Sequence, residues 1–338
     1  MKRDIKKVKM NLGKRSYDIT IGESILENTQ SYMNLNRKVA IVTDSGVPRE
    51  YSEAIASQCK KSVIISFPKG EESKNLDTYA YICQQMLTFG LQRRDAVVAV
   101  GGGVVGDMAG FAAATYMRGI DFYNVPTTLL SQVDSSIGGK TAIDFGGVKN
   151  ILGAFYQPKA VLIDTAVLKT LEARQFSAGL AEVAKMALTS DAELFSMLED
   201  SLWEKDIATL IERALIIKRD VVEEDERESG LRKILNFGHT FGHGIEALGN
   251  LYHGECVALG MLPMCSPTVR KRLSFLLSKM GLPTEIPSNY KDGFEFMRHD
   301  KKGDGDTVDA VFVDEVGSFR LEKLSLEKLF SRIEKNIL

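Results

Sequence analysis

The sequence AVVAVGGGVVGDMAGFAAAT, residues 96–115, predicts a buried strand that turns sharply into a helix. An apolar run precedes the glycines of a G-x-G-x-x-G pattern, and an alanine-rich segment follows them. Glycines let the backbone turn tightly and approach a pyrophosphate, and the first turn of the helix offers free N–H groups. This order of elements indicates a dinucleotide site, and a tight turn without a ligand is the simpler alternative.

Similar short apolar runs lie on both sides of this turn. They are residues 39–43, 63–67, 122–125 and 160–164, and segments with helical periodicity separate them. Continuous apolar strands alternating with helices indicate a parallel sheet covered on both faces. The alternating run 17–21 predicts an added β element. We therefore expect a Rossmann-like α/β domain that binds a dinucleotide over residues 1–165.

The pattern changes after residue 164, and almost everything from 165 to about 282 has helical periodicity. Segments 193–198, 207–222 and 231–248 are the clearest predicted helices. Residues 310–321 could hold two short strands before a final helix. The second domain, residues 166–338, is thus predicted to be mostly helical.

The bulk composition limits the partners of the chain. It has 338 residues and a net charge of −2, so no global basic field attracts nucleic acid or anionic lipid. No apolar run reaches the roughly 18 residues that span a bilayer. The basic N-terminus has no apolar stretch behind it, so we expect no secretory signal. Four cysteines without a C-x-x-C pair suit a reducing cytosol. We expect a cytoplasmic protein without nucleic-acid or membrane partners.

Three of the four histidines, His239, His243 and His253, lie within 15 residues of one another. Imidazole binds zinc well, and a catalytic zinc site needs about three protein ligands and an open position. His239 and His243 are the obvious pair from their i, i+4 spacing. If 231–248 is one helix, a single arc contains five polar residues: Arg232, Asn236, His239, His243 and Glu246. Such an arc predicts a cleft lined by these polar side chains. The alternative is a solvent-exposed helix face, with the histidines hydrogen-bonded in the core.

Four acidic residues are further candidates. Glu182 interrupts an apolar helical stretch and could complete the metal site, although an ion pair with Lys185 at i+3 is the simpler explanation. The dinucleotide fingerprint also requires an acid about 20 residues after the glycines. Asp121 has that spacing and Asp44 ends the first parallel strand, and spacing alone does not choose between them. A carboxylate at Asp107 would repel a pyrophosphate, so we expect it to face the ribose or nicotinamide.

Several long segments together resemble the 3-dehydroquinate synthase family. They span the middle half of the chain in the order of the family: GGGVVGDMAGFAAATYMRG (101–119), VPTTLLSQVDSSIGGKTAID (125–144), KNILGAFYQP (149–158), SAGLAEVAK (177–185), LNFGHTFGHGIE (235–246) and LYHGECVALGM (251–261). GEESK (70–74) and HDKKG (299–303) extend the match more weakly. The resemblance implies a homodimer that uses NAD and zinc, with cobalt as the other metal, on a seven-carbon phosphorylated sugar acid. One alcohol is oxidised, phosphate is eliminated, the ketone is reduced again and a carbocycle closes.

The resemblance also implies a role for each matching residue. The metal ligands would be Glu182, His239 and His253, which moves His243 to the substrate. The substrate site would be lined by Asp134, Lys140, Asn150, Lys185, Lys218, Glu228, Arg232, Asn236 and His243. The phosphate would be reached by Arg118, from its own or the neighbouring subunit, and by one of Lys301 and Lys302. NAD would be held by Asp44, Glu71, Lys74, Gly102, Gly103, Val104, Val105, Asp107, Thr127, Thr128, Lys140 and Lys149.

The chain departs from the family after residue 261. The segment 262–277 is short and contains Pro263 and Pro267, which break helices. We expect altered packing near His253. Three alternatives to the family reaction remain: a sister cyclase that makes an inosose, a metal-dependent alcohol dehydrogenase, and a non-catalytic protein that binds a nucleotide.

Overall fold

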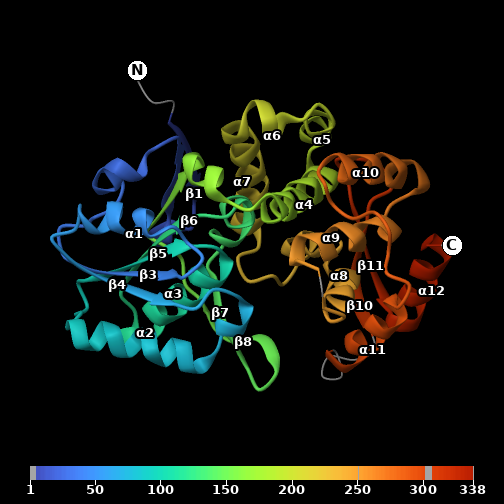
Figure 1. Cartoon of the computed structure of the whole chain (residues 1–338). Helices are drawn as coiled ribbons and strands as arrows, with labels where there is room; N and C mark the ends of the chain where they lie inside the picture. The colour runs from blue at the N-terminus through green and yellow to red at the C-terminus, as the bar shows by residue number, and fades with distance from the viewer. Residues whose placement is uncertain (1–4, 250, 301–306, 338) are drawn as a thin grey trace. The chain divides into compact units, whose positions relative to one another are not determined.

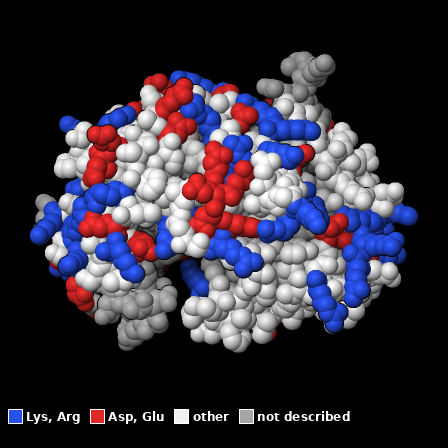
Figure 2. Space-filling model, turned by 180° about the vertical axis from the view of Figure 1, so that it is seen from behind, with Lys and Arg blue, Asp and Glu red and all other residues white. Residues whose placement is uncertain are grey.

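The structure is a computed structural model that describes residues 5–249, 251–300 and 307–337 (Figure 1). The chain divides into two compact units, Met1–Leu171 and Glu172–Leu338. Of the described helices, none is both long enough and apolar enough to cross a membrane. On the face of the molecule in Figure 2, Lys and Arg side chains are interspersed with Asp and Glu.

A seven-stranded sheet forms the centre of the first unit. Its strand order is β1-β2-β9-β6-β5-β3-β4. Every neighbouring pair is parallel except β1 and β2, which are antiparallel. The bounds are β1 Lys6–Met10, β2 Tyr17–Gly22, β3 Lys38–Asp44, β4 Lys61–Phe67, β5 Ala96–Gly101, β6 Asp121–Pro126 and β9 Ala160–Asp164. The predicted α/β fold with an added β element is confirmed.

Helices cover both faces of this sheet, which explains why its strands are apolar throughout. Val97 and Ala99 of β5 face a core shared with α2 (Leu76–Phe89) and α3 (Gly103–Thr115), whereas Val98 and Val100 face a second core. Successive side chains of a strand point to opposite faces, so burial on both faces requires apolar residues at every position. The remaining helical elements are η1 Gly13–Arg15, η2 Leu26–Ser31, α1 Arg49–Ala56, η3 Glu71–Ser73, η4 Tyr116–Arg118, η5 Ser131–Ser135 and η6 Thr165–Thr170.

An antiparallel hairpin, β7 (Lys140–Phe145) with β8 (Val148–Phe155), was not predicted. Gly146 and Gly147 form its turn, with φ of +62° and +80°. Two successive residues with positive φ are typical of the tightest hairpin turns, and a Gly-Gly pair is their sequence signal. The hairpin matters for the site because it carries Lys149 and Asn150.

The second unit is mostly helical, as predicted. Two strands and a final helix follow the helices, in agreement with the prediction for residues after 310. The elements are α4 Ala173–Ser190, α5 Ala192–Glu199, α6 Leu202–Lys205, α7 Ile207–Glu224, η7 Leu231–Asn236, α8 His239–Glu246, α9 His253–Met261, η8 Leu262–Met264, α10 Pro267–Lys279, α11 Tyr290–Asp300, β10 Thr307–Phe312, β11 Arg320–Ser325 and α12 Leu326–Ile337.

The prediction of one helix over 231–248 is wrong. The backbone turns at Gly238, where φ is +77°, so η7 and α8 are separate elements. A Cβ atom at Gly238 would lie 2.7 Å from the carbonyl oxygen of Val257 in α9, so the neighbouring helix requires glycine here. The predicted arc of five polar residues is therefore also wrong, because Arg232 and Asn236 precede the turn and do not share a helix with His239.

Glycines bring three helices of this unit into close contact. A Cβ atom at Gly242 of α8 would lie 2.9 Å from the carbonyl oxygen of Cys256 in α9. One at Gly260 would collide with the carbonyl oxygen of Gly238, and one at Gly254 with that of Ala178 in α4. The start of α9 is thus held against both α4 and α8.

The two prolines after residue 261 fall where helices tolerate them. Pro263 lies in η8, and Pro267 is the first residue of α10, where the missing N–H group has no helical partner. The side chain of Ser266 caps α10 by accepting a hydrogen bond from the Val269 N–H group at 3.4 Å. The prediction that packing near His253 differs from the family stays a prediction.

The glycine contacts give a testable prediction for stability. Gly260→Ala should lower the free energy of unfolding by about 3 kcal/mol, because the added methyl group meets rigid backbone. Gly249→Ala is the matched control, since Gly249 has a φ of +77° but no atom within 4 Å of the place an added methyl group would occupy. It should lose only about 1 kcal/mol, through left-handed strain. Urea unfolding followed by circular dichroism measures both, and equal losses would contradict the argument.

Candidate active site

Three side chains from different helices of the second unit converge on one point. They are Glu182 of α4, His239 at the start of α8 and His253 at the start of α9, and their ligand atoms all lie within 4.8 Å of one another. Oε1 of Glu182 lies 3.7 Å from Nε2 of His239 and 3.6 Å from Nε2 of His253. Ligands 2.0–2.1 Å from a tetrahedral zinc ion are about 3.3 Å apart, so the spacing suits a metal between them.

Glu182 is in an environment that favours a bound cation. Its side chain is 1% exposed. The ammonium of Lys185 lies 2.5 Å from Oε2, so the ion pair suggested by their spacing is present. The other oxygen, Oε1, faces the imidazoles of His239 and His253, and an ion pair with Lys185 does not explain that arrangement. The donor set of one carboxylate and two imidazoles fits a divalent metal.

Both imidazoles present Nε2 because a neighbour engages Nδ1. Nδ1 of His239 lies 3.2 Å from the Phe237 carbonyl oxygen, and Nδ1 of His253 lies 3.1 Å from a carboxylate oxygen of Glu246. Burial and the charge of Lys185 lower the pKa of His239 well below its usual value, which favours the neutral form that binds metals. Burial opposes charge on His253, but Glu246 and Glu182 outweigh it and raise the pKa of that imidazole.

His243 does not join His239 in a ligand set. It belongs to a second possible set with Glu246 and His253, and its ring centroid is 5.6 Å from that of His239. His243 is exposed, whereas His239 turns its Nε2 toward buried Glu182. The i, i+4 spacing suggested His239 and His243 as the pair, but the histidines that face the Glu182 carboxylate are His239 and His253.

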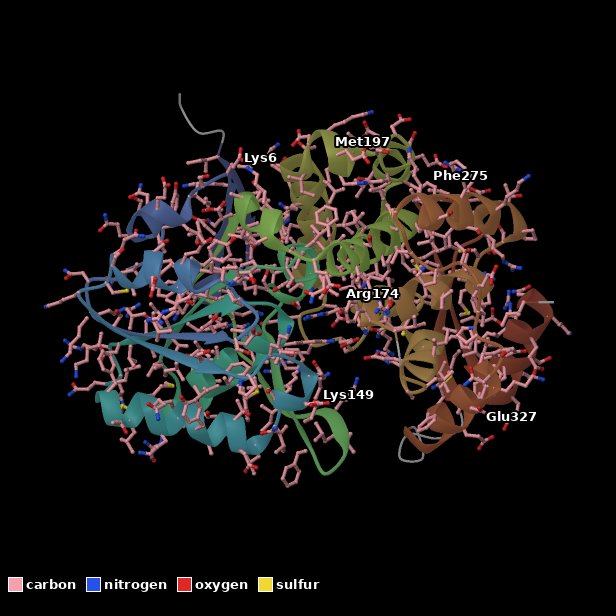
Figure 3. The ribbon with its side chains drawn as sticks, viewed as in Figure 1. Lys6, Lys149, Arg174, Met197, Phe275 and Glu327 are labelled. Carbon is pink, nitrogen blue, oxygen red and sulfur yellow. The ribbon has the colours of Figure 1, made fainter. Side chains whose placement is uncertain are left out.

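An ion pair fixes the start of α9. The guanidinium of Arg174 in α4, which is labelled in Figure 3, donates two hydrogen bonds of 2.7 Å to Glu255 and lies 4.4 Å from the ring centroid of Tyr252. Glu255 also accepts a hydrogen bond of 2.8 Å from the Tyr252 N–H group and so caps the helix. His253 follows Tyr252 directly, so its backbone is anchored from α4.

Among the described residues of this unit, three cations are buried. Lys185, Lys218 and Arg232 are 1%, 5% and 2% exposed. Buried positive charges require anionic or polar partners, and a substrate with a carboxylate and a phosphate would add two anions. Nearby in sequence, Asn236 donates a hydrogen bond of 2.8 Å to Glu228, whose φ of +61° is uncommon for a residue other than glycine.

Asp225 holds the loop that carries Glu228 and Arg232, and sequence reasoning did not identify it. Its carboxylate accepts hydrogen bonds from the N–H groups of Ser229 at 2.9 Å, Gly230 at 2.6 Å and Arg232 at 3.1 Å. Burial alone would raise the pKa of Asp225, but these donors outweigh it and lower the pKa to about 2. The only available signal was a short Asp…Ser-Gly sequence, which is typical of a turn.

The glycine-rich turn of the first unit lies where a parallel sheet binds ligands. Gly101 ends β5, Gly102 precedes α3, and no described side chain caps that helix. Its first N–H groups can therefore face a phosphate. Thr127 directly follows β6, and its N–H group donates to the Gly101 carbonyl at 2.9 Å. Thr128 sits close enough that a Cβ atom at Gly102 would meet its methyl group at 3.1 Å.

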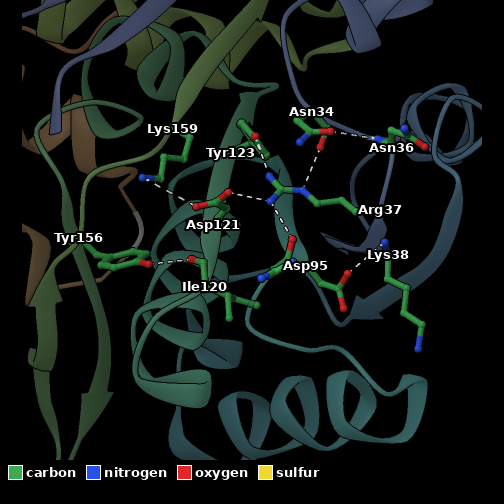
Figure 4. Close-up of polar contacts among 11 residues, drawn as sticks. Asn34, Asn36, Arg37, Lys38, Asp95, Ile120, Asp121, Tyr123, Tyr156 and Lys159 are labelled. Atoms are coloured by element: carbon green, nitrogen blue, oxygen red, sulfur yellow. Dashed lines mark hydrogen bonds and ion pairs between the residues drawn. The ribbon is translucent and has the colours of Figure 1, made fainter. Parts of the chain in front are cut away.

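The strand register distinguishes Asp44 from Asp121. Asp121 pairs with Ala96 and Pro126 pairs with Gly101, so Asp121 lies at the amino end of β6, about 16 Å from the glycines. There its carboxylate accepts a hydrogen bond of 2.7 Å from Arg37, which also donates to Tyr123 (Figure 4). Asp44 instead ends β3 at the same edge of the sheet as the glycines. The register thus supports Asp44 as the acid that contacts ribose.

Lys74 contacts three other residues of the first unit that were predicted to lie in the site. Its ammonium lies 2.6 Å from Asp107 and 3.9 Å from Glu71, and it donates a hydrogen bond to Asn150. Burial opposes the charge of Lys74, but the two carboxylates outweigh it and raise the pKa. Because Lys74 neutralises Asp107, a carboxylate in the first turns of α3 need not repel a pyrophosphate. The expectation that Asp107 faces ribose or nicotinamide stays a prediction.

The other predicted residues are distributed as follows. Lys149 and Asn150 lie on β8, Lys140 begins β7, and Asp134 lies in η5. Arg118 ends η4 and is exposed, in a turn where Met117, Arg118 and Gly119 all have positive φ. Lys301 and Lys302 lie outside the described residues.

The chain is similar over almost its full length to known 3-dehydroquinate synthases. Models of the N-terminal and C-terminal parts of 3-dehydroquinate synthase match residues 64–178 and 179–303. The 3-dehydroquinate synthase of Pelobacter propionicus is 43% identical over 350 aligned positions, which cover 95% of this chain and 97% of that protein.

Two solved structures of related cyclases are also similar. A 2-deoxy-scyllo-inosose synthase complexed with carbaglucose-6-phosphate, NAD+ and Co2+ superposes with a TM-score of 0.89 at 29% identity, covering 98% of this chain and 100% of that one. The 2-epi-5-epi-valiolone synthase of Streptomyces hygroscopicus, with NAD+ and Zn2+ bound, superposes with a TM-score of 0.84 at 28% identity. The match covers 96% of this chain and 98% of that one.

The register argument predicts different effects for two aspartates. Asp44→Ala should weaken NAD binding about 10-fold or more, because a hydrogen bond from ribose to a carboxylate is lost. Asp121→Ala is the matched control and should leave NAD affinity unchanged while lowering the melting temperature, because Arg37 loses its partner. Calorimetric titration of each variant with NAD measures the affinities. If Asp121→Ala bound NAD more weakly and Asp44→Ala did not, Asp121 would be the residue that contacts the ribose.

Asp225 predicts a specific dependence of stability on pH. Because folding lowers its pKa from 3.8 to about 2, the carboxylate stabilises the fold above pH 3.8, and this stabilisation is lost as the pH falls toward 2. Asp225→Asn should therefore be less stable near neutral pH and should lose stability less steeply between pH 4 and 2. Urea unfolding between pH 4 and 2 measures the free energy of unfolding of both proteins. If this free energy fell equally steeply with pH in the variant and the wild type, the prediction would be contradicted.

Proposed function

The chain belongs to the 3-dehydroquinate synthase family, and from that premise we propose which of its residues carry out the reaction. The enzyme converts 3-deoxy-D-arabino-heptulosonate 7-phosphate to 3-dehydroquinate and phosphate, a carbon–oxygen lyase reaction of the shikimate pathway to aromatic amino acids. Its cofactors are NAD and a divalent metal, Zn2+ or Co2+. The convergence of Glu182, His239 and His253 in a chain of this family is the observation that carries the proposal.

Glu182, His239 and His253 would hold the metal. When bound, the metal would act as a Lewis acid that lowers the pKa of the substrate hydroxyl to be oxidised. Lys185, at 2.5 Å from Glu182, keeps positive charge beside that carboxylate. Exposed His243 has its ring centroid 5.8 Å from that of His253, so it would orient a substrate hydroxyl or transfer its proton.

The buried cations of the helical unit would recognise the substrate anions. Lys218 and Arg232 are almost fully buried, and the hydrogen bonds of Asp225 fix the backbone of Arg232. Guanidinium and ammonium groups form charge-assisted hydrogen bonds with carboxylate and phosphate. Asn236 and Glu228, already paired with each other, would bind hydroxyl groups of the same substrate. Asp134, Asn150, Arg118 and Lys302 would complete the contacts.

The nucleotide would bind at the carboxyl edge of the sheet in the first unit. The free N–H groups at the start of α3, from Gly102 to Val105, would hold the pyrophosphate of NAD, and Asp44 would bind the adenosine ribose. Thr127, Thr128 and Lys149 would add hydrogen bonds. Lys74 pairs with both Glu71 and Asp107 at this edge, so the three side chains form one charged group.

Elimination of phosphate requires no dedicated protein base. The ketone formed by oxidation makes the neighbouring C–H group acidic, and the departing phosphate can take that proton. Lys140 and Lys185 would then stabilise the developing negative charge without transferring protons. The homodimer and the cytoplasmic location stay predictions, as does the absence of nucleic-acid and membrane partners.

A coupled assay tests the reaction and the residue roles. With the heptulosonate phosphate, NAD and zinc, the enzyme should release phosphate without net NADH, and chelation should stop turnover. Lys185→Ala should lower kcat about 100-fold or more, because it removes charge beside the reacting atoms. Lys271→Ala, an exposed lysine of α10, is the control and should leave kcat unchanged.

Other outcomes of this assay identify the alternatives. Net NADH formation would indicate a metal-dependent dehydrogenase. Turnover of a hexose phosphate to an inosose, with none of the heptulosonate, would indicate a sister cyclase. Full turnover of Lys185→Ala would overturn the role given to Lys185.

A further inference from the structure

Glu246, the last residue of α8, contacts the imidazole of His253 from the side away from Glu182. Its carboxylate oxygen lies 3.1 Å from Nδ1 of His253, while Nε2 of the same ring lies 3.6 Å from Oε1 of Glu182. The ring thus lies between two carboxylates, one from α8 and one from α4. Glu246 is neither one of the three proposed metal ligands nor one of the proposed substrate contacts.

The two histidines of the metal set differ in what engages Nδ1. For His239 it is the neutral carbonyl of Phe237, whereas for His253 it is the anionic side chain of Glu246. A carboxylate at Nδ1 fixes the proton there, leaves the lone pair of Nε2 free and makes that nitrogen a stronger donor to a metal.

His253 is also the histidine that most needs orientation. Its side chain is 34% exposed, against 13% for His239, so packing restricts its ring less. Its backbone is anchored through Tyr252 and Glu255, but that cap does not determine the rotation of the ring. Glu246, at 21% exposure, is shielded enough for its hydrogen bond to be effective.

We propose that Glu246 is a positioning residue that orients His253 and strengthens its bond to the metal. The inference rests on the proposed metal site. A direct ligand role for Glu246, in the set with His243 and His253, is the competing arrangement. The set with Glu182 is favoured because that carboxylate is buried and its Oε1 lies 3.7 Å and 3.6 Å from Nε2 of His239 and His253.

Zinc affinity tests the proposal without reference to turnover. The dissociation constant of the full chain for Zn2+ would be measured by competition with a chromophoric chelator at fixed pH. Glu246→Gln keeps the size of the side chain and removes its charge, so it should weaken zinc binding about 10- to 100-fold. Glu246→Asp keeps the charge and should recover part of that loss. Glu285→Gln, the same change at an exposed residue of this unit, should bind zinc as the wild type does.

Two further measurements separate positioning from other roles. Melting temperatures of the metal-free proteins should be the same for wild type and Glu246→Gln, which excludes a general loss of folding. With Co2+ bound, the intensity of the visible absorption bands should be unchanged in Glu246→Gln, because the number of ligands is unchanged.

Three results would overturn the inference. A zinc dissociation constant of Glu246→Gln within twofold of the wild type would show that Glu246 does not act on the metal. A change in coordination number in the Co2+ spectrum would show that it is a direct ligand. If the wild type and His239→Ala bind zinc equally weakly, the proposed metal site fails, and this inference fails with it.

Discussion

The candidate metal site depends on how closely α8 and α9 approach each other. Helices that pack through ordinary side chains lie 8–10 Å apart. Here glycines at 238, 242 and 260 remove the side chains that would separate them, and Gly254 lets α9 approach the backbone of α4. His239 and His253 are the first residues of the two helices, so any separation of the helices would move the imidazoles away from Glu182. The packing and the ligand set are therefore determined by the same residues.

Paired burial of opposite charges is the second feature common to both units. Removing a carboxylate from water has a penalty of several kcal/mol unless positive charge compensates for it. Lys185 compensates for Glu182 in the helical unit, and Lys74 compensates for Asp107 in the nucleotide-binding unit. Lys185 approaches Oε2 of Glu182, so Oε1 remains directed at the imidazoles of His239 and His253.

The sequence predicted those features that depend on neighbours along the chain. The strands were recognised because burial on both faces makes them apolar throughout, and the glycine turn because it needs glycine at fixed places. The β7–β8 hairpin was missed because most of β8 is exposed and has no apolar alternation. The break at Gly238 was missed because α9, about 20 residues later, imposes it. Spacing singled out His239 and His243 as the ligand pair for the same reason, and the resemblance placed His253 in the ligand set in place of His243. Asp225 and Glu246 act through contacts that no local pattern reveals.

The two ends of the parallel sheet have different chemistry, and this separates Asp121 from Asp44 as candidates for a ribose contact. At the amino ends, Arg37, Asp121 and Tyr123 satisfy one another's hydrogen bonds, so that edge is closed to a ligand. At the carboxyl ends, glycines and an uncapped helix leave N–H groups available. A fixed spacing from glycine to acid identifies a ribose contact only when it brings the acid to the carboxyl edge. Asp44 reaches that edge from the neighbouring strand, so its position in the sheet outweighs its distance along the sequence.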